Sequence, residues 1–104
     1  MLKVIYALYR KEGMSREDFA RHWTEVHAPL AAKLPNVRSY TINPVTAAMQ
    51  VEGTEADGFA ILTFDSQADF EAAAASPEMA AAGEDAATFA RHFDVYLVEE
   101  HLVR

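Results

Sequence analysis

Cysteine is absent from this chain of 104 residues, and glycine is scarce, with four isolated residues. Without cysteine the protein has no disulfide framework and no thiolate nucleophile. Without a glycine-rich segment it has no phosphate-binding loop and no recognisable flavin or nicotinamide motif, so we expect no cofactor. We also expect no metal, because the histidines do not show the spacing of a metal-binding helix.

Basic residues are outnumbered, with 9 Lys and Arg against 16 Asp and Glu, which gives a net charge of -7. Such a surface disfavours nucleic acid and anionic membranes as partners. No segment approaches the roughly 20 consecutive apolar residues of a membrane-spanning helix, and the apolar run after Met1 is too short for a secretory signal. We therefore expect a cytoplasmic protein that binds neither nucleic acid nor a membrane.

Hydrophobic residues make up 51% of the chain, and they form short apolar runs typical of buried strands and one stripe at helical spacing. Apolar runs predict strands at residues 2–9, 37–42, 58–64 and 93–98. Serine caps and helical spacing predict helices at residues 15–34, 67–75 and 76–90, with Gly83 as a candidate break in the last. Residues 44–57 are the longest predicted loop, and residues 99–104 form a tail. Because we find no linker or repeat, we expect residues 1–104 to be one domain.

The first helical region carries the clearest periodicity. Ser15 is expected to cap it by accepting a hydrogen bond from the amide of the third helical residue. One apolar stripe follows at helical spacing: Phe19, Trp23, Val26, Leu30 and Leu34. Pro29 lies inside this region, so we expect a kink or a tightened turn near residues 25–29.

The element order β-α-β-β-α-β predicts a ferredoxin-like α+β sandwich with its helices on one face of the sheet. The opposite face should then be polar, yet the predicted strands 2–9, 58–64 and 93–98 carry large apolar residues at consecutive positions. An open apolar sheet face indicates an interface. We predict a homodimer in which two sheets stack about a two-fold axis to form a dimeric α+β barrel. The alternative is a monomer whose tail or long loop covers the face.

Several segments share a further pattern: Met14-Ser15-Arg16-Glu17-Asp18-Phe19, Trp23, Val26-His27-Ala28-Pro29-Leu30, residues 33–38, Tyr40, residues 58–66, Phe70-Glu71-Ala72 and Ser76-Pro77-Glu78. Together they resemble the EthD family, over nearly the whole chain. The resemblance implies a ferredoxin-like fold and a barrel dimer. Methylmuconolactone methylisomerase, a relative, rearranges a lactone without a cofactor and uses a histidine and a tyrosine that match His27 and Tyr40. Fungal relatives dehydrate aromatic polyketides, and some members are labelled reductases.

Two side chains are candidates for catalysis. At 100° per residue, His27 lies about 60° from the centre of the apolar stripe, so it can face the crevice between helix and sheet. Its imidazole, with an ordinary pKa near 6.5, can serve as acid or base at neutral pH. Tyr40, on the next strand, can donate a hydrogen bond to a developing oxyanion. The alternative is a structural His27 at the helix-sheet junction and a Tyr40 that is an ordinary core aromatic.

Aromatic side chains are candidates for substrate binding, with ordinary core packing as the alternative: Tyr6, Trp23, Phe64 and Tyr96. His22 precedes His27 in the same helical region. In an α-helix the spacing between them turns the two side chains about 140° apart. We therefore expect His22 at the surface, and no metal site shared by the two histidines.

These residues fit a cofactor-independent enzyme of isomerase or dehydratase type, acting on a small apolar carbonyl, lactone or aromatic compound in a catabolic pathway. They also fit a non-catalytic accessory protein that binds such a compound, and an EthD-type oxidoreductase component is a further alternative. Only the enzyme needs His27 and Tyr40 to converge on one cavity.

Overall fold

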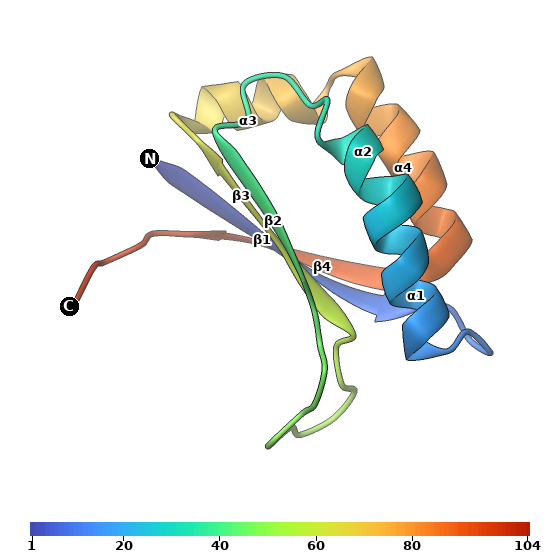
Figure 1. Cartoon of the computed structure of the whole chain (residues 1–104). Helices are drawn as coiled ribbons and strands as arrows, with labels where there is room; N and C mark the ends of the chain where they lie inside the picture. Colours follow the sequence, from blue (N-terminus) through green and yellow to red (C-terminus); the bar gives the residue numbers. More distant parts are fainter.

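The computed structural model describes residues 1–104 as helices packed on one face of a four-stranded sheet (Figure 1). The strands are β1 (Leu2–Arg10), β2 (Ser39–Pro44), β3 (Gly58–Phe64) and β4 (Ala90–Val98). They lie in the order β2-β3-β1-β4, and each neighbouring pair is antiparallel. This arrangement confirms the predicted ferredoxin-like α+β fold.

Three consecutive segments make up the first helical region: α1 (Arg16–His22), η1 (Trp23–His27) and α2 (Ala28–Ala31). The second helical region consists of α3 (Gln67–Ala74) and α4 (Pro77–Phe89), and α4 runs through Gly83 without a break. Ser15, Ser66 and Ser76 each accept a hydrogen bond from a backbone amide of the first turn, at 3.0, 3.2 and 3.1 Å. The predicted serine caps are confirmed.

The segment η1 is a π-helix, which is wider than an α-helix, where the sequence predicted a kink or a tightened turn. The amide of Ala28 bonds to the carbonyl of Trp23, five residues back. Pro29 has no amide hydrogen, and its ring would collide with the carbonyl of Glu25 in a regular helix. A π-turn just before Pro29 accommodates both defects.

The wider turn changes which residues of η1 face inward, so the buried stripe differs from the predicted one. His27 is buried, with 9% of its surface exposed, whereas Val26 is 44% exposed. Ala31 and Leu34 continue the buried side. The predicted stripe is therefore wrong at Val26, whose place His27 takes.

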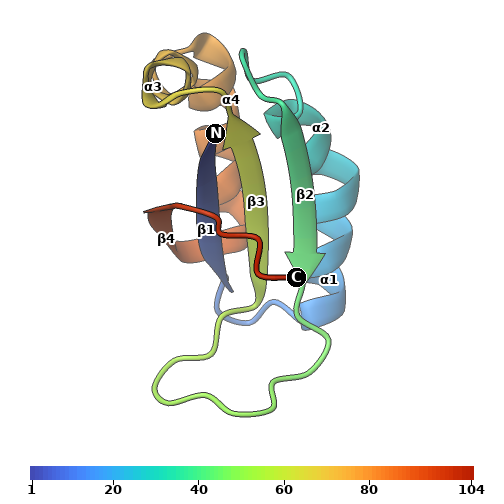
Figure 2. The ribbon, with the colours of Figure 1, turned by 90° about the vertical axis from the view of Figure 1, so that its left-hand side faces the viewer.

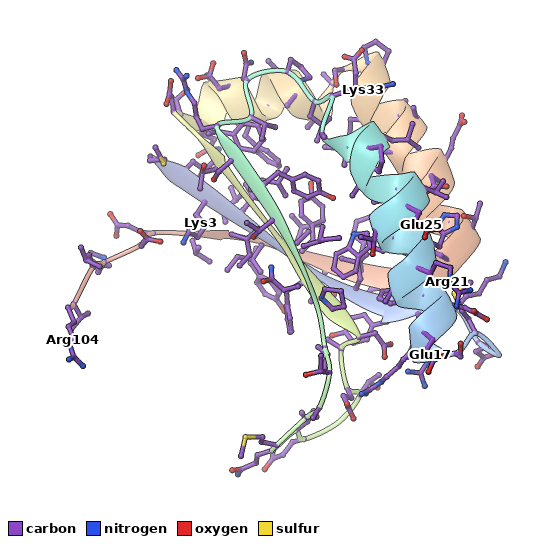
Figure 3. All side chains as sticks on the ribbon, in the orientation of Figure 1. Lys3, Glu17, Arg21, Glu25, Lys33 and Arg104 are labelled. Carbon is purple, nitrogen blue, oxygen red and sulfur yellow. The ribbon has the colours of Figure 1, made fainter.

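The core fills the space between the helices and the sheet. Its largest fully buried side chains are Trp23, Phe19, Phe64, Phe89 and Val4. Burying each contributes about 1.5–3 kcal/mol to folding. Figure 3 shows Glu17, Arg21, Glu25 and Lys33 on the opposite side of the first helical region, pointing into solvent. This division gives the first helical region its inner face, from which Trp23 reaches β3 and His27 reaches α4.

The other face of the sheet carries no helix (Figure 2). Its centre is apolar, because the register sets Ile5 of β1 beside Ile61 of β3 and Tyr96 of β4. The tail of residues 99–104 extends away from this face in Figure 1, and Leu102 and Val103 are 88% and 94% exposed. The tail therefore does not cover the sheet. None of the helices combines the length and the apolar character that spanning a membrane requires.

Candidate active site

A cavity of about 80 Å³ lies between the first helical region, α4 and the sheet. Its wall is almost entirely apolar and includes Leu8, Ala31, Leu34, Ala60, Leu62 and Met79. Phe93 of β4 also lines the cavity and is 46% exposed, so the cavity opens to solvent beside this strand. A small apolar wall of this kind favours a small apolar molecule, or the apolar part of a larger one.

Of the side chains proposed from the sequence, His27, Tyr40, Tyr6 and Trp23 line this cavity. They come from η1, β2, β1 and η1, so the fold brings together residues that are distant in the sequence.

The structure places the other candidates, Phe64 and Tyr96, outside the cavity. Phe64 is fully buried at the end of β3, where its ring centroid lies 5.3 Å from that of Phe70 on α3. Tyr96 lies beside Ile5 on the open face of the sheet and is 55% exposed. The alternation of side chains along a strand explains the position of Tyr96, since its neighbours Val95 and Leu97 take the helix side.

Asp85 of α4 holds the ring of His27. The Nδ1 atom of His27 lies 2.9 Å from Oδ2 of Asp85. An ionised carboxylate only accepts hydrogen bonds, so the neutral ring carries its proton on Nδ1 and its lone pair on Nε2. No protein group hydrogen-bonds to Nε2, and 11% of the side chain remains exposed. Nε2 is therefore the nitrogen that a ligand can reach.

Burial sets the protonation states of the two central side chains. Loss of hydration lowers the pKa of His27 below its ordinary 6.5, and Asp85 opposes this shift without cancelling it. Burial raises the pKa of Tyr40 to about 12, against a smaller lowering by the Trp23 indole. At neutral pH the cavity therefore holds a neutral imidazole that can accept a proton and a phenol that can donate a hydrogen bond.

His22 also contacts Asp85, contrary to the prediction that it lies at the surface away from His27. Its Nε2 atom lies 2.9 and 3.0 Å from the two carboxylate oxygens, and 27% of the side chain is exposed. The π-turn is the physical reason, because it brings a residue round to the side of the fifth residue after it. No group of three or more histidine and acidic side chains is arranged to hold a metal ion.

Asp85 was not among the residues proposed from the sequence, because the acidic residues were interpreted as a solvated surface. One signal was available, because Asp85 lies three residues after Ala82 and four before Phe89, and both of these are buried. Residues at these spacings share one side of a helix. A carboxylate on the buried side of a helix needs a partner, and the histidines provide it.

Comparison with known proteins identifies one family. A family model for the EthD domain matches residues 11–92. An ethyl tert-butyl ether D (EthD) family protein from Bacillus halodurans has a similar structure, with 24% identity and a TM-score of 0.80 over 97% of this chain and 100% of that chain. No curated protein matches the chain.

Two further solved structures share the fold at lower identity. A dimeric ferredoxin-like protein of unknown function from Bacteroides fragilis has 19% identity and a TM-score of 0.69, covering 95% of each chain. SnoaB from Streptomyces nogalater, a cofactor-independent oxygenase, has 12% identity and a TM-score of 0.63, covering 99% of this chain and 97% of that chain. Because the EthD model spans most of the sequence and the fold agrees with it, the protein belongs to the EthD family.

Proposed function

We propose that the protein is a cofactor-independent enzyme that moves a proton on a small apolar carbonyl, lactone or aromatic compound. The observation that carries the proposal is the convergence of His27 and Tyr40 on one apolar cavity. Nε2 of His27 takes a proton from a carbon next to a carbonyl group. Tyr40 donates a hydrogen bond to the oxygen on which negative charge then develops.

Isomerisation and dehydration suit this pair of groups. In isomerisation the imidazolium of His27 returns its proton to a different carbon, and the enolate collapses to the shifted double bond. In dehydration the same proton goes to a leaving hydroxyl group, which departs as water. Both reactions begin and end with a neutral imidazole, and neither changes the oxidation state of the protein. We also propose that this reaction belongs to a pathway that degrades such compounds.

A cofactor-independent oxygenase is the second candidate, because SnoaB shares the fold. In that case the carbanion formed by His27 reacts with dioxygen supplied as the second substrate. Oxygen uptake that accompanies turnover of the organic compound distinguishes this reaction from isomerisation and dehydration.

We further propose that two copies pair through their open sheet faces and that the protein works in the cytoplasm. The apolar centre of the open face and the dimeric ferredoxin-like protein of the same fold support the pairing. The lack of cysteine supports a reducing compartment.

The test is a panel of lactones, phenolic ketones and quinones, offered to the parent protein and to His27→Gln. Glutamine keeps much of the size and polarity of histidine but does not titrate. We expect a compound that binds both proteins, read by Trp23 fluorescence, and a turnover that falls by about 10²–10⁴-fold in His27→Gln. With the parent, turnover should decline in acid, at a pH lower than an ordinary histidine would give, because burial lowers the pKa of His27 and protonation removes the Nε2 lone pair.

His101→Gln is the matched control, since His101 lies in the exposed tail, and it should leave turnover unchanged. Unchanged turnover in His27→Gln would contradict the proposal. If the parent binds a compound of the panel and transforms none, the cavity serves an accessory protein that only binds small molecules.

A further inference from the structure

The indole nitrogen of Trp23 is the one buried side-chain polar atom that has no hydrogen-bond partner. The side chain has no exposed surface, so water outside the protein does not satisfy this donor either. Leaving a buried donor unpaired costs about 1–3 kcal/mol, and native proteins pair nearly all such groups. An unpaired donor beside a cavity therefore points to a ligand.

Gly58 fixes the orientation of the indole. A Cβ atom on Gly58 would lie 2.1 Å from Cζ3 and 2.7 Å from Cη2 of Trp23, so the six-membered ring of the indole rests directly on the backbone of β3. The five-membered ring, which carries the N–H group, therefore lies on the side of the indole away from Gly58. Phe19 packs against Trp23 with a centroid distance of 5.5 Å and helps to hold this position.

Tyr40 supplies a second donor in the same place. Trp23 and Tyr40 line one cavity, and the indole is near enough to the Tyr40 hydroxyl to lower its pKa slightly against the effect of burial. The hydroxyl remains protonated at neutral pH, and no protein group accepts a hydrogen bond from it. The indole N–H and the Tyr40 hydroxyl are thus neighbours in the cavity wall, and no hydrogen bond of normal geometry joins them to each other or to another protein group.

The other residues of the cavity wall restrict the charge and the size of the ligand. No lysine or arginine lines the cavity, which disfavours a carboxylate or phosphate group with its full charge. The volume of about 80 Å³ is below the roughly 150 Å³ of an engineered cavity that encloses benzene. One ring can therefore enter only with part of it in the opening beside Phe93.

We propose that the Trp23 indole N–H and the Tyr40 hydroxyl together bind a single acceptor oxygen on an apolar ring, most strongly when that oxygen is a phenolate or an enolate. This inference rests on the proposed function and names the ligand class of the same cavity. In the proposed reaction, Trp23 and Tyr40 then both stabilise the negative charge that develops when His27 removes a proton.

The single tryptophan makes a direct test possible, because the ¹⁵N-labelled protein shows one indole N–H resonance. The probes are 4-nitrophenol, as its phenolate, and 4-nitrotoluene, which has a methyl group in place of the oxygen. We expect the indole proton to move downfield with 4-nitrophenol and to stay near its free position with 4-nitrotoluene. We also expect 4-nitrophenol to bind about tenfold to hundredfold more tightly, as a hydrogen bond to a charged acceptor requires.

Two variants remove one donor each. Tyr40→Phe removes the hydroxyl, and biosynthetic replacement of Trp23 by benzothienylalanine removes the N–H group while keeping the shape of the ring. Each should reduce the preference for 4-nitrophenol by about tenfold and leave 4-nitrotoluene binding unchanged. Tyr9→Phe is the control, because the Tyr9 hydroxyl donates to Asp94 on the open face, 3.1 Å away, and it should leave both affinities unchanged.

The proposal is overturned if 4-nitrophenol binds no more tightly than 4-nitrotoluene, or if the indole resonance responds equally to both. These measurements involve no turnover, so they are separate from the test of His27. If His27→Gln retains turnover while the preference for 4-nitrophenol stands, the proton-transfer function fails and the pair of donors survives.

Discussion

The carboxylate of Asp85 contacts two imidazoles, those of His22 and His27, and this shared contact governs which nitrogen of each ring carries a proton. Each ring donates to the carboxylate, so each keeps its other nitrogen as the acceptor. For His27, which lines the cavity, this leaves Nε2 as the free acceptor. In the proposed reaction Asp85 is therefore a positioning residue, which acts through His27 and not by touching the substrate.

Asp85→Asn should lower the pKa of His27 further. The carboxylate stabilises the protonated imidazole, whereas burial favours the neutral ring, so its removal leaves burial unopposed. The amide of asparagine can also donate to Nδ1, which moves the ring proton to Nε2 and blocks the base. We expect His27 to titrate at a lower pH than in the parent, as followed by the NMR shifts of the ring protons, and turnover to fall.

Asp94→Asn is the matched control for this change. Asp94 also pairs with a histidine, His92 at 2.8 Å, but on the open face of the sheet. It should leave the titration of His27 as it is in the parent. A pKa of His27 that is unchanged or raised in Asp85→Asn would show that the contact has no electrostatic effect on the ring.

The sequence allowed His27, Tyr40, Tyr6 and Trp23 to be named as candidates, and all four line the cavity. The helical period of residues 15–34 and the apolar runs of the strands were enough to place these elements. Asp85 could not be recognised in the same way, since the alanines around it form no stripe of large side chains. Tyr96 lies outside the cavity, and its side could not be predicted because apolar residues on both sides of a strand do not reveal which side meets the helices. Phe64 is on the helix side, but it lies at the end of β3 and packs against Phe70 in the core, which was the alternative for this residue.

The helical segment η1 is the element whose conformation was hardest to predict from the local sequence. The prediction used 100° per residue throughout residues 15–34, which holds for an α-helix only. Pro29 indicated a defect but not its kind, since a kink, a tightened turn and a π-turn all avoid the missing hydrogen bond. The caps at Ser15, Ser66 and Ser76 were predictable because capping depends on a few adjacent residues.

Gly58→Ala should destabilise the fold at the junction of β3 and η1. The added Cβ would lie 2.1 Å from Cζ3 of a fully buried Trp23, and neither the strand nor the ring has space to move. We expect a loss of about 1–3 kcal/mol in the free energy of unfolding, measured by urea denaturation, and a shift of Trp23 fluorescence.

Gly83→Ala is the opposite case within α4. A Cβ atom at Gly83 meets nothing within 4 Å, and alanine is the better helix former. This variant should stabilise the protein by about 0.5–1 kcal/mol in the same urea measurement. Equal effects of the two substitutions would contradict the account of Trp23 resting on the backbone of β3.

The helices cover one face of the sheet and leave the other face without a helix (Figures 1 and 2). The register of the strands gives this open face an apolar centre. Ile5, Ile61 and Tyr96 meet there, with polar residues of β2 such as Thr41 at one side. The sequence predicted apolar residues on both faces of the sheet. It did not indicate which of these residues face away from the helices. A single sheet with one open apolar face gains stability when a second copy covers it.

Ile61→Asp should therefore convert a dimer into a monomer. The charge would stand at the centre of the open face, where pairing of two copies would bury it beside its symmetry mate. Sedimentation should give twice the chain mass for the parent and the chain mass for Ile61→Asp at the same concentration. Val26→Asp places the same charge at an apolar side chain that is 44% exposed on the helical side, and it should remain dimeric. A monomeric parent, or dissociation by Val26→Asp, would mean that the open face is not where two copies meet.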